Sequence, residues 1–252
     1  MEKGTDKTVV VTGGSRGIGA ACVRGFAGAG WNVVLTYRSE SDIAREVTRA
    51  VAAAGRRAVA VQADVSSEAD VMALFGQVDT EFGPPDALVN NAGVAAAPSR
   101  VDELGAARIE RILAVNVLGA FLCAREAVRR MSTRHGGTGG CIVNISSAAT
   151  RIGSPDEYVD YAASKAAVET MTLGLAKEVG GEGIRVNAVR PGIIDTEIHA
   201  RTGQPDKAQR VGATVPMGRA GTPGEVASAV VWLCEAESAY VNGAILDVTG
   251  GR

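Results

Sequence analysis

The feature that most constrains this chain is an alternation, from end to end, of short β-branched runs with longer amphipathic segments. This alternation is typical of βα units that build a parallel sheet. The predicted strands are Thr8–Thr12, Asn32–Tyr37, Ala58–Gln62, Ala87–Asn90, Cys141–Ser146, Arg185–Val189 and Ile245–Val248. The predicted helices are Gly17–Ala29, Asp42–Ala54, Glu68–Phe82, Arg108–Arg134, Tyr161–Val179 and Pro223–Cys234. We therefore predict an α/β fold with a doubly wound parallel sheet of about seven strands and helices on both faces.

The 252 residues suit one large α/β domain, and no linker-like stretch divides them. We predict a single domain over residues 1–252. The least regular segment is Asp195–Thr222, where glycines and prolines break any long helix. Two interpretations stay open for it: a mobile flap over a ligand, or an ordered surface loop.

Charge and composition exclude several classes of function. The 26 basic and 28 acidic residues leave a net charge of −2, which gives no basic surface for nucleic acid. The first seven residues are polar and no apolar run reaches about 18 residues, so we expect neither secretion nor membrane insertion. The cysteines lie far apart without ligand spacing, which predicts buried thiols in the cytoplasm and no metal site. They are Cys22, Cys123, Cys141 and Cys234.

A glycine-rich turn follows the first predicted strand and opens the first predicted helix. Its backbone amides and the helix N-terminus can face a pyrophosphate, and glycine permits close approach. The turn lacks the Lys-Ser or Lys-Thr pair of an ATP- or GTP-binding loop. Although such a turn can be purely structural, its place in the chain predicts a dinucleotide-binding Rossmann fold. The predicted contacts are Gly13, Ser15, Arg16, Gly17, Ile18 and Gly19.

The end of the second predicted strand indicates which dinucleotide binds. An NAD-binding protein usually carries an acidic residue there, whereas this chain has Arg38 and Ser39. Arg38 and Arg16 can converge on a 2′-phosphate through charge-assisted bonds. We predict NADP as the cofactor, with NAD possible. The alternative is a pair of solvated surface arginines.

A tyrosine and a lysine four residues apart, Tyr161 and Lys165, lie on one face of a predicted helix. Lowering the pKa of a tyrosine from about 10 to neutrality takes about 4 kcal/mol. One ammonium about 4 Å away supplies about that much at an effective dielectric of about 20. We therefore expect the charge of Lys165 alone to be nearly enough to bring the pKa of Tyr161 to neutrality. Tyr158 has Ala162 at the corresponding position, so we exclude it as the acid.

The order Gly13, Gly17, Gly19, together with the Tyr161 and Lys165 pair, resembles the short-chain dehydrogenase/reductase family along nearly the whole chain. Because adjacent strand residues point oppositely, we expect only one of Ser146 and Ser147 to face the site. The resemblance implies that Ser147 is that residue and the third catalytic residue. It implies that Asn116 supports a proton relay to the lysine. It also implies further cofactor contacts, beside Tyr161 and Lys165, at Asp64, Val65, Asn91, Ala92, Gly93, Pro191, Gly192, Ile194 and Thr196.

The resemblance implies an NADP(H)-dependent oxidoreductase that interconverts a carbonyl and an alcohol on a small or medium substrate. The alternatives are a 3-oxoacyl-carrier-protein reductase or a sugar dehydrogenase of the same family, and a non-catalytic dinucleotide sensor. Two features depart from the family. Ser147 and Tyr161 lie one residue further apart in the sequence than is common in the family. Glu182 stands where the carrier-protein reductases have a basic residue, and its negative charge disfavours binding of an acidic carrier protein.

The family associates through its two long helices and its last strand, so we expect a homo-oligomer, specifically a tetramer. The helix that carries Tyr161 also holds small and apolar residues beside its catalytic face, which would let two copies approach closely. These are Ala163, Ala166, Ala167, Met171 and Leu175. The alternative is that all of them pack inside one chain.

Overall fold

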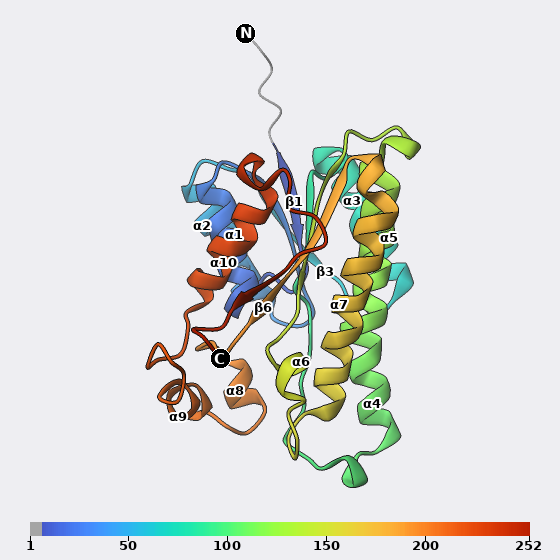
Figure 1. Cartoon of the computed structure of the whole chain (residues 1–252). Helices are drawn as coiled ribbons and strands as arrows, with labels where there is room; N and C mark the ends of the chain where they lie inside the picture. The colour runs from blue at the N-terminus through green and yellow to red at the C-terminus, as the bar shows by residue number, and fades with distance from the viewer. Residues whose placement is uncertain (1–6) are drawn as a thin grey trace.

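The computed structural model describes residues 7–252, and in that range seven strands form one parallel sheet (Figure 1). The strand order is β3-β2-β1-β4-β5-β6-β7. The strands are β1 (Thr8–Val11), β2 (Asn32–Tyr37), β3 (Ala58–Gln62), β4 (Ala87–Asn90), β5 (Gly140–Ile145), β6 (Ile184–Pro191) and β7 (Ile245–Val248). The predicted doubly wound fold is confirmed, and the predicted strand ends differ from the observed ones by at most two residues.

Helices cover both faces of the sheet, as Figure 1 shows. One face packs against α1 (Gly17–Gly28), α2 (Ser41–Ala53) and α10 (Pro223–Cys234). The other packs against α3 (Glu68–Phe82), α5 (Gly119–Met131) and α7 (Val159–Val179), and α4 (Ala106–Leu113) continues the line of α5. Short helices lie near the carboxyl ends of the strands: α6 (Ala149–Ile152), α8 (Ile198–Arg201) and α9 (Lys207–Gly212).

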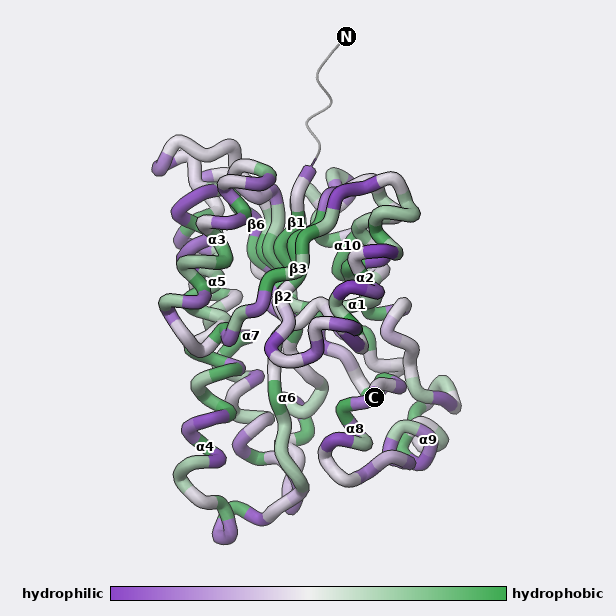
Figure 2. Tube along the Cα trace, turned by 180° about the vertical axis from the view of Figure 1, so that it is seen from behind, coloured by the Kyte–Doolittle hydropathy of each residue, from purple (hydrophilic) through white to green (hydrophobic). Residues whose placement is uncertain are grey.

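The two-sided burial explains why the strands are apolar without alternation. Val9 and Val11 belong to the cluster under α1 and α10, while Val10 between them belongs to the cluster under α3 and α5. All three are 0% exposed. Because successive strand residues point to opposite faces, each face needs its own apolar residues. Figure 2 shows the strands as a continuous hydrophobic layer between more polar helices.

The strand order places a crevice at the carboxyl ends of β1 and β4. These strands are neighbours, but the chain leaves β1 toward α1 on one face and leaves β4 toward α4 and α5 on the other. The loops therefore diverge and leave room between them, which is where open α/β sheets bind ligands.

The predicted helix Arg108–Arg134 is observed as an uninterrupted helical run over residues 106–131, but it is not α-helical throughout. The structure has α4 and α5 separated by a π-helical turn, Ala114–Leu118, which centres on Asn116. Both hydrogen-bonding groups of the Asn116 amide are engaged by the main chain of Val94, at 2.8 and 3.0 Å. These tertiary bonds accompany the extra residue in the turn, a feature that periodicity does not reveal.

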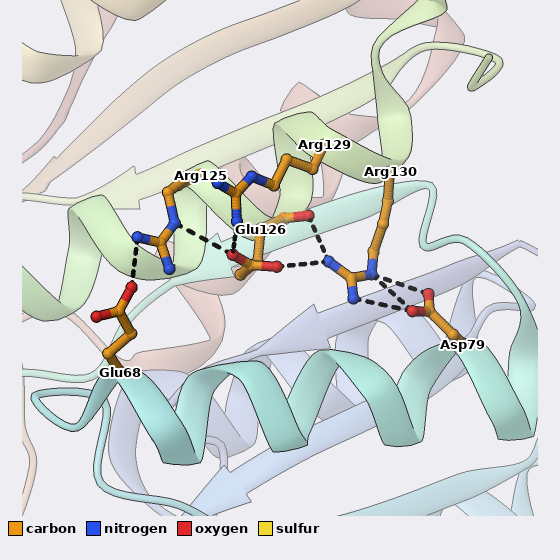
Figure 3. Close-up of polar contacts among 6 residues, drawn as sticks. All are labelled: Glu68, Asp79, Arg125, Glu126, Arg129 and Arg130. Atoms are coloured by element: carbon orange, nitrogen blue, oxygen red, sulfur yellow. Dashed lines mark hydrogen bonds and ion pairs between the residues drawn. The ribbon is translucent and has the colours of Figure 1, made fainter. Parts of the chain in front are cut away.

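An ion-pair network joins α3 to α5 (Figure 3). The Glu126 carboxylate, 5% exposed, accepts hydrogen bonds from Arg125, Arg129 and Arg130 at 2.8–3.1 Å. Arg130 also donates to Asp79 of α3 at 2.9 Å. Burial alone would raise the pKa of Glu126, but these arginines outweigh it and hold the pKa below its usual value. The network therefore favours a charged Glu126 between the two helices.

The polar N-terminus, from which we predicted no secretion, lies mostly in residues 1–6, outside the described residues. Within residues 7–252, no helix has the length and apolar character needed to cross a membrane. In the same range no group of three or more acidic, histidine or cysteine side chains is arranged to hold a metal ion.

Candidate active site

A cavity of about 550 Å³ opens at the carboxyl ends of the strands. It is lined by the glycine-rich loop, the end of β2, the segments after β3 and β4, the Ser147 segment, the start of α7 and the segment after β6. Every residue predicted to bind cofactor or to act in catalysis lines this cavity except Gly19 and Asn116. The structure thus brings together residues that are far apart in the sequence.

Three positions in the turn between β1 and α1 require glycine for steric reasons. Gly13 and Gly17 have φ of +62° and +51°, a conformation that side chains disfavour. A Cβ at Gly19 would lie 2.2 Å from the Gly13 carbonyl oxygen, so α1 could not pack against the turn. Gly19 therefore allows α1 to pack closely against the turn, and its predicted contact with a cofactor stays a prediction. At α1, no side chain caps the N-terminal amides and no acidic residue lies in the first turn. This arrangement fits an anion such as a pyrophosphate.

Polar side chains fix the loop to its neighbours. The Asn91 amide donates to the carbonyls of Thr12 and Gly13, both at 2.9 Å. The Thr12 hydroxyl accepts from the main chain of Ala92 at 3.0 Å, and the Thr36 hydroxyl accepts from Gly13 at 2.9 Å. The Asn91 side chain thus supports the glycine loop, although it was predicted as a cofactor contact. Thr36 has the same kind of role and was not predicted.

The two predicted phosphate-binding arginines line one end of the cavity, and each pairs with a carboxylate. Arg16 pairs with Glu40, and Arg38 lies 3.2 Å from Asp64. Burial tends to raise the pKa of Asp64, but hydrogen bonds from Ser66 and the charge of Arg38 lower it overall. Glu40 was not predicted, although it stands only three residues after the end of β2.

Ser147 and Tyr161 are hydrogen-bonded in the cavity wall. Burial raises the pKa of Tyr161 above its usual value, and the bond with Ser147 only partly opposes this rise. The Lys165 Nζ lies 5.8 Å from the centroid of the Tyr161 ring. Our expectation that Lys165 alone nearly suffices to activate the phenol is therefore wrong, because it left out the desolvation of both groups.

Lys165 is 4% exposed, and its Nζ donates to the Ile145 carbonyl at 2.7 Å. Burial lowers the pKa of Lys165 to about 8. A Cβ at Gly93 would lie 3.3 Å from this nitrogen and 3.4 Å from Asn116 Oδ1. The lysine and the asparagine thus both adjoin the same glycine in the loop after β4.

Asn116 lies behind the cavity wall and is 2% exposed. Besides its bonds to Val94, its Nδ2 donates to the Ser164 hydroxyl at 3.0 Å. The side chain therefore ties the π-helical turn to both the β4 loop and α7. Its part in a proton relay stays a prediction.

The segment after β6 forms the remaining wall of the cavity. The four residues of this segment that were predicted to contact the cofactor all line it: Pro191, Gly192, Ile194 and Thr196. Gly192 has no room for a side chain, because a Cβ would lie 2.8 Å from the Cα of Thr249. Their contact with a bound cofactor stays a prediction.

The Asp195–Thr222 segment contains α8 and α9 and contributes cavity residues that the sequence did not reveal. Gln204 donates to the Tyr158 hydroxyl at 2.8 Å, and the Lys207 Nζ lies 4.4 Å from the centre of the Tyr158 ring. Tyr158 itself lines the cavity, but its hydroxyl is engaged by Gln204 of this segment. No short motif marks these residues, and only their place in the fold identifies them.

A glycine loop at the N-terminus of α1, at the switch point of a parallel sheet, defines a dinucleotide-binding protein. The hydrogen-bonded Ser147 and Tyr161 beside Lys165 add the groups of a dehydrogenase. Comparison with known proteins agrees: the model of a family described as "Enoyl-(Acyl carrier protein) reductase" matches residues 13–252. The chain belongs to the short-chain dehydrogenase/reductase family.

Individual relatives match over almost the whole chain. An uncharacterized oxidoreductase of Escherichia coli is 50% identical over 96% of this chain and 98% of its own. A 3beta-hydroxysteroid dehydrogenase of Eggerthella lenta is 44% identical over 97% of this chain and 93% of its own. A blue fluorescent protein from a metagenomic library, solved in complex with NADPH, is 37% identical, with a TM-score of 0.88 over 97% of each chain.

Proposed function

We propose that this protein is an NADP(H)-dependent oxidoreductase that interconverts a carbonyl and an alcohol on a small or medium substrate. The observation that carries the proposal is that Ser147, Tyr161 and Lys165 share one cavity with the glycine loop. A protein that only senses a dinucleotide needs the loop, but it does not need a phenol hydrogen-bonded to a serine beside a buried ammonium. This combination supports an enzyme over a sensor.

Each of the three side chains has a distinct role in the proposal. Ser147 donates a hydrogen bond to the substrate oxygen and orients it. Tyr161 donates its proton to that oxygen in reduction and removes it in oxidation. Lys165 binds the nicotinamide ribose and places a positive charge near the phenol. When bound, the cofactor supplies or accepts the hydride, and its oxidised ring adds positive charge that favours the phenolate.

The choice of NADP rests on Arg16 and Arg38. Both line the cavity end next to β2, where a 2′-phosphate would need positive charge. The solved relative that binds NADPH supports this choice. Glu40 and Asp64 already pair with these arginines, so a phosphate must compete with two carboxylates. NAD therefore stays the alternative cofactor.

The substrate is a carbonyl compound or the corresponding alcohol. The name of the steroid dehydrogenase relative supports a secondary alcohol carried on a ring. Glu182, from which we argued against an acyl-carrier substrate, lies before the amino end of β6 and bonds to Ser132 at 2.5 Å. The cavity is at the opposite ends of the strands, so Glu182 does not face it. A 3-oxoacyl-carrier-protein reductase and a sugar dehydrogenase stay as alternatives.

The test is consumption of NADPH across a panel of aldehydes, cyclic and open-chain ketones, quinones and 3-oxo thioesters. Tyr161→Phe is expected to bind NADPH normally and to lose turnover by about 10²-fold or more, because it removes one hydroxyl and little volume. Tyr158→Phe is the matched control from the same cavity and keeps most activity. If the two outcomes are reversed, the assignment of the acid is wrong, and a fully active Tyr161→Phe points to a different mechanism.

We further propose a homotetramer. On α4, the turn after it and α5, Leu113, Leu118 and Phe121 are 43–50% exposed. On α7, Leu173 is 42% exposed. Met171 from our predicted contact face is instead buried within the chain, at 7% exposure. The exposed residues are candidates for a surface that a second copy covers.

A cytoplasmic location is also part of the proposal. All four cysteines are free and buried, as expected for a protein in a reducing compartment.

A further inference from the structure

A partly buried carboxylate on the helix of Tyr161 and Lys165 has no part in the proposed reaction. Glu169 lies one helical turn after Lys165 on α7, and its side chain is 12% exposed. Its Oε1 accepts from Ser146 Oγ at 2.5 Å and from Arg190 Nε at 2.8 Å, while Oε2 accepts from Arg190 Nη2 at 2.8 Å. A carboxylate with this many donors is firmly oriented.

The contacts of Glu169 reach the chain on both sides of Ser147. Ser146 precedes it, and the bond to Glu169 turns the Ser146 side chain toward α7. Thr150 follows it, and its hydroxyl oxygen lies 3.0 Å from Glu169 Oε1 and 3.0 Å from the Ser147 carbonyl oxygen. Ser146 and Ser147 are consecutive residues just beyond the end of β5, so fixing the Ser146 side chain against α7 also restricts the main chain that carries Ser147 at the cavity wall.

Arg190 extends these contacts to the neighbouring strand. Its Nη1 donates to Asp247 of β7 at 2.9 Å, and the other oxygen of Asp247 lies 2.7 Å from Arg151 of α6. Glu169, Arg190, Asp247 and Arg151 thus link α7, β6, β7 and α6. Helix α6 belongs to the Ala148–Asp160 segment, in which this chain has one residue more than is common in the family. The ion pairs hold the start of that segment in place.

We propose that Glu169 is a positioning residue, which holds Ser147 in its catalytic orientation through Ser146 and Thr150. The inference rests on the proposed role of Ser147 in binding the substrate oxygen. Without the carboxylate, Ser146 can rotate away from α7 and the main chain around Ser147 gains freedom. A small displacement of a group that binds the reacting oxygen lowers the rate of the chemical step, and it leaves the distant cofactor contacts unchanged.

The experiment uses the isosteric variant Glu169→Gln, with Glu178→Gln, exposed on the same helix, as the matched control. The assay is NADPH-dependent reduction of the panel compound that the parent protein reduces fastest. We expect kcat of Glu169→Gln to fall about 10-fold, while KM for NADPH stays within about twofold. Glu178→Gln is expected to match the parent in both. An unchanged kcat, or equal changes in kcat for both variants, overturns the proposal.

A double-mutant cycle with Ser146→Ala separates positioning from a general loss of stability. If Glu169 acts through Ser146, the double variant loses little more kcat than Glu169→Gln alone. If the losses of kcat in the two single variants are fully additive in the double variant, Glu169 does not act through Ser146. A crystal structure of Glu169→Gln gives a readout without substrate: Ser147 Oγ is expected to leave its hydrogen bond with Tyr161, and an unmoved Ser147 contradicts the proposal.

Ser147→Ala distinguishes this inference from the proposed function. If Ser147→Ala is fully active, the proposed role of Ser147 fails and the inference fails with it. If Ser147→Ala is inactive while Glu169→Gln is fully active, only the positioning role of Glu169 is refuted.

Discussion

Replacing Lys165 by methionine is expected to stabilise the fold while abolishing turnover. Burial lowers the pKa of Lys165 from 10.5 to about 8. Keeping this side chain protonated in the folded protein therefore lowers the free energy of unfolding. At about 1.4 kcal/mol for each pKa unit, this reduction is about 3 kcal/mol at pH 7. Methionine removes the charge, but it also removes the 2.7 Å hydrogen bond to the Ile145 carbonyl. The loss of that bond lowers the free energy of unfolding by about 1–2 kcal/mol. The expected net gain is about 1–2 kcal/mol.

The sign of the pH dependence provides a sharper test than the net value. Above pH 8 the folded protein releases the Lys165 proton while the unfolded chain still holds it, so the stability of the parent rises with pH. Between pH 7 and pH 9.5 we expect the parent to gain about 2 kcal/mol relative to Lys165→Met. Other groups titrate equally in both proteins and cancel in the difference.

The assay is urea unfolding of both proteins at the two pH values and at one protein concentration, since association would otherwise shift the transition. Lys177→Met, at an exposed position on α7, is the control and is expected to show no such pH-dependent difference. If the free-energy difference between the parent and Lys165→Met is the same at pH 7 and pH 9.5, Lys165 is not desolvated as argued, and its proposed role near the phenol loses its basis.

Three further predictions concern cofactor choice, stability and assembly. Arg38→Asp is expected to lower kcat/KM for NADPH about 100-fold and to reverse the preference toward NADH, with Arg49→Asp on α2 as the control; equal efficiencies with both cofactors in the parent would refute it. Glu126→Gln is expected to lower the free energy of unfolding by about 1–3 kcal/mol at pH 7, because it leaves arginines without their shared carboxylate. Since the pKa of Glu126 is held low, this loss should shrink as the pH falls below about 4, and a pH-independent loss contradicts the argument. Light scattering is expected to give about four times the 25.8 kDa chain mass, and the mass of one chain would exclude the tetramer.

The sequence alone was sufficient for the fold class and for most of the predicted residues that line the cavity. Period-2 and period-3.6 patterns are local, so strands such as Asn32–Tyr37 and helices such as Glu68–Phe82 have the predicted bounds. The turn ending at Gly19 was recognisable because backbone shape and phosphate binding both demand glycine at fixed spacing. Tyr161 and Lys165 were recognisable because one helical turn separates them.

Only the tertiary structure decided the features that depend on distant partners. The main chain of Val94 holds the turn at Asn116. Glu40 pairs with Arg16, and Glu169 orients the side chain of Ser146. None of these contacts leaves a pattern within one segment. The same holds for the pKa of Tyr161: its spacing from Lys165 is local, but the burial that raises the pKa comes from strands and loops assembled around it. Desolvation is a property of the whole fold, and a sequence read segment by segment contains no measure of it.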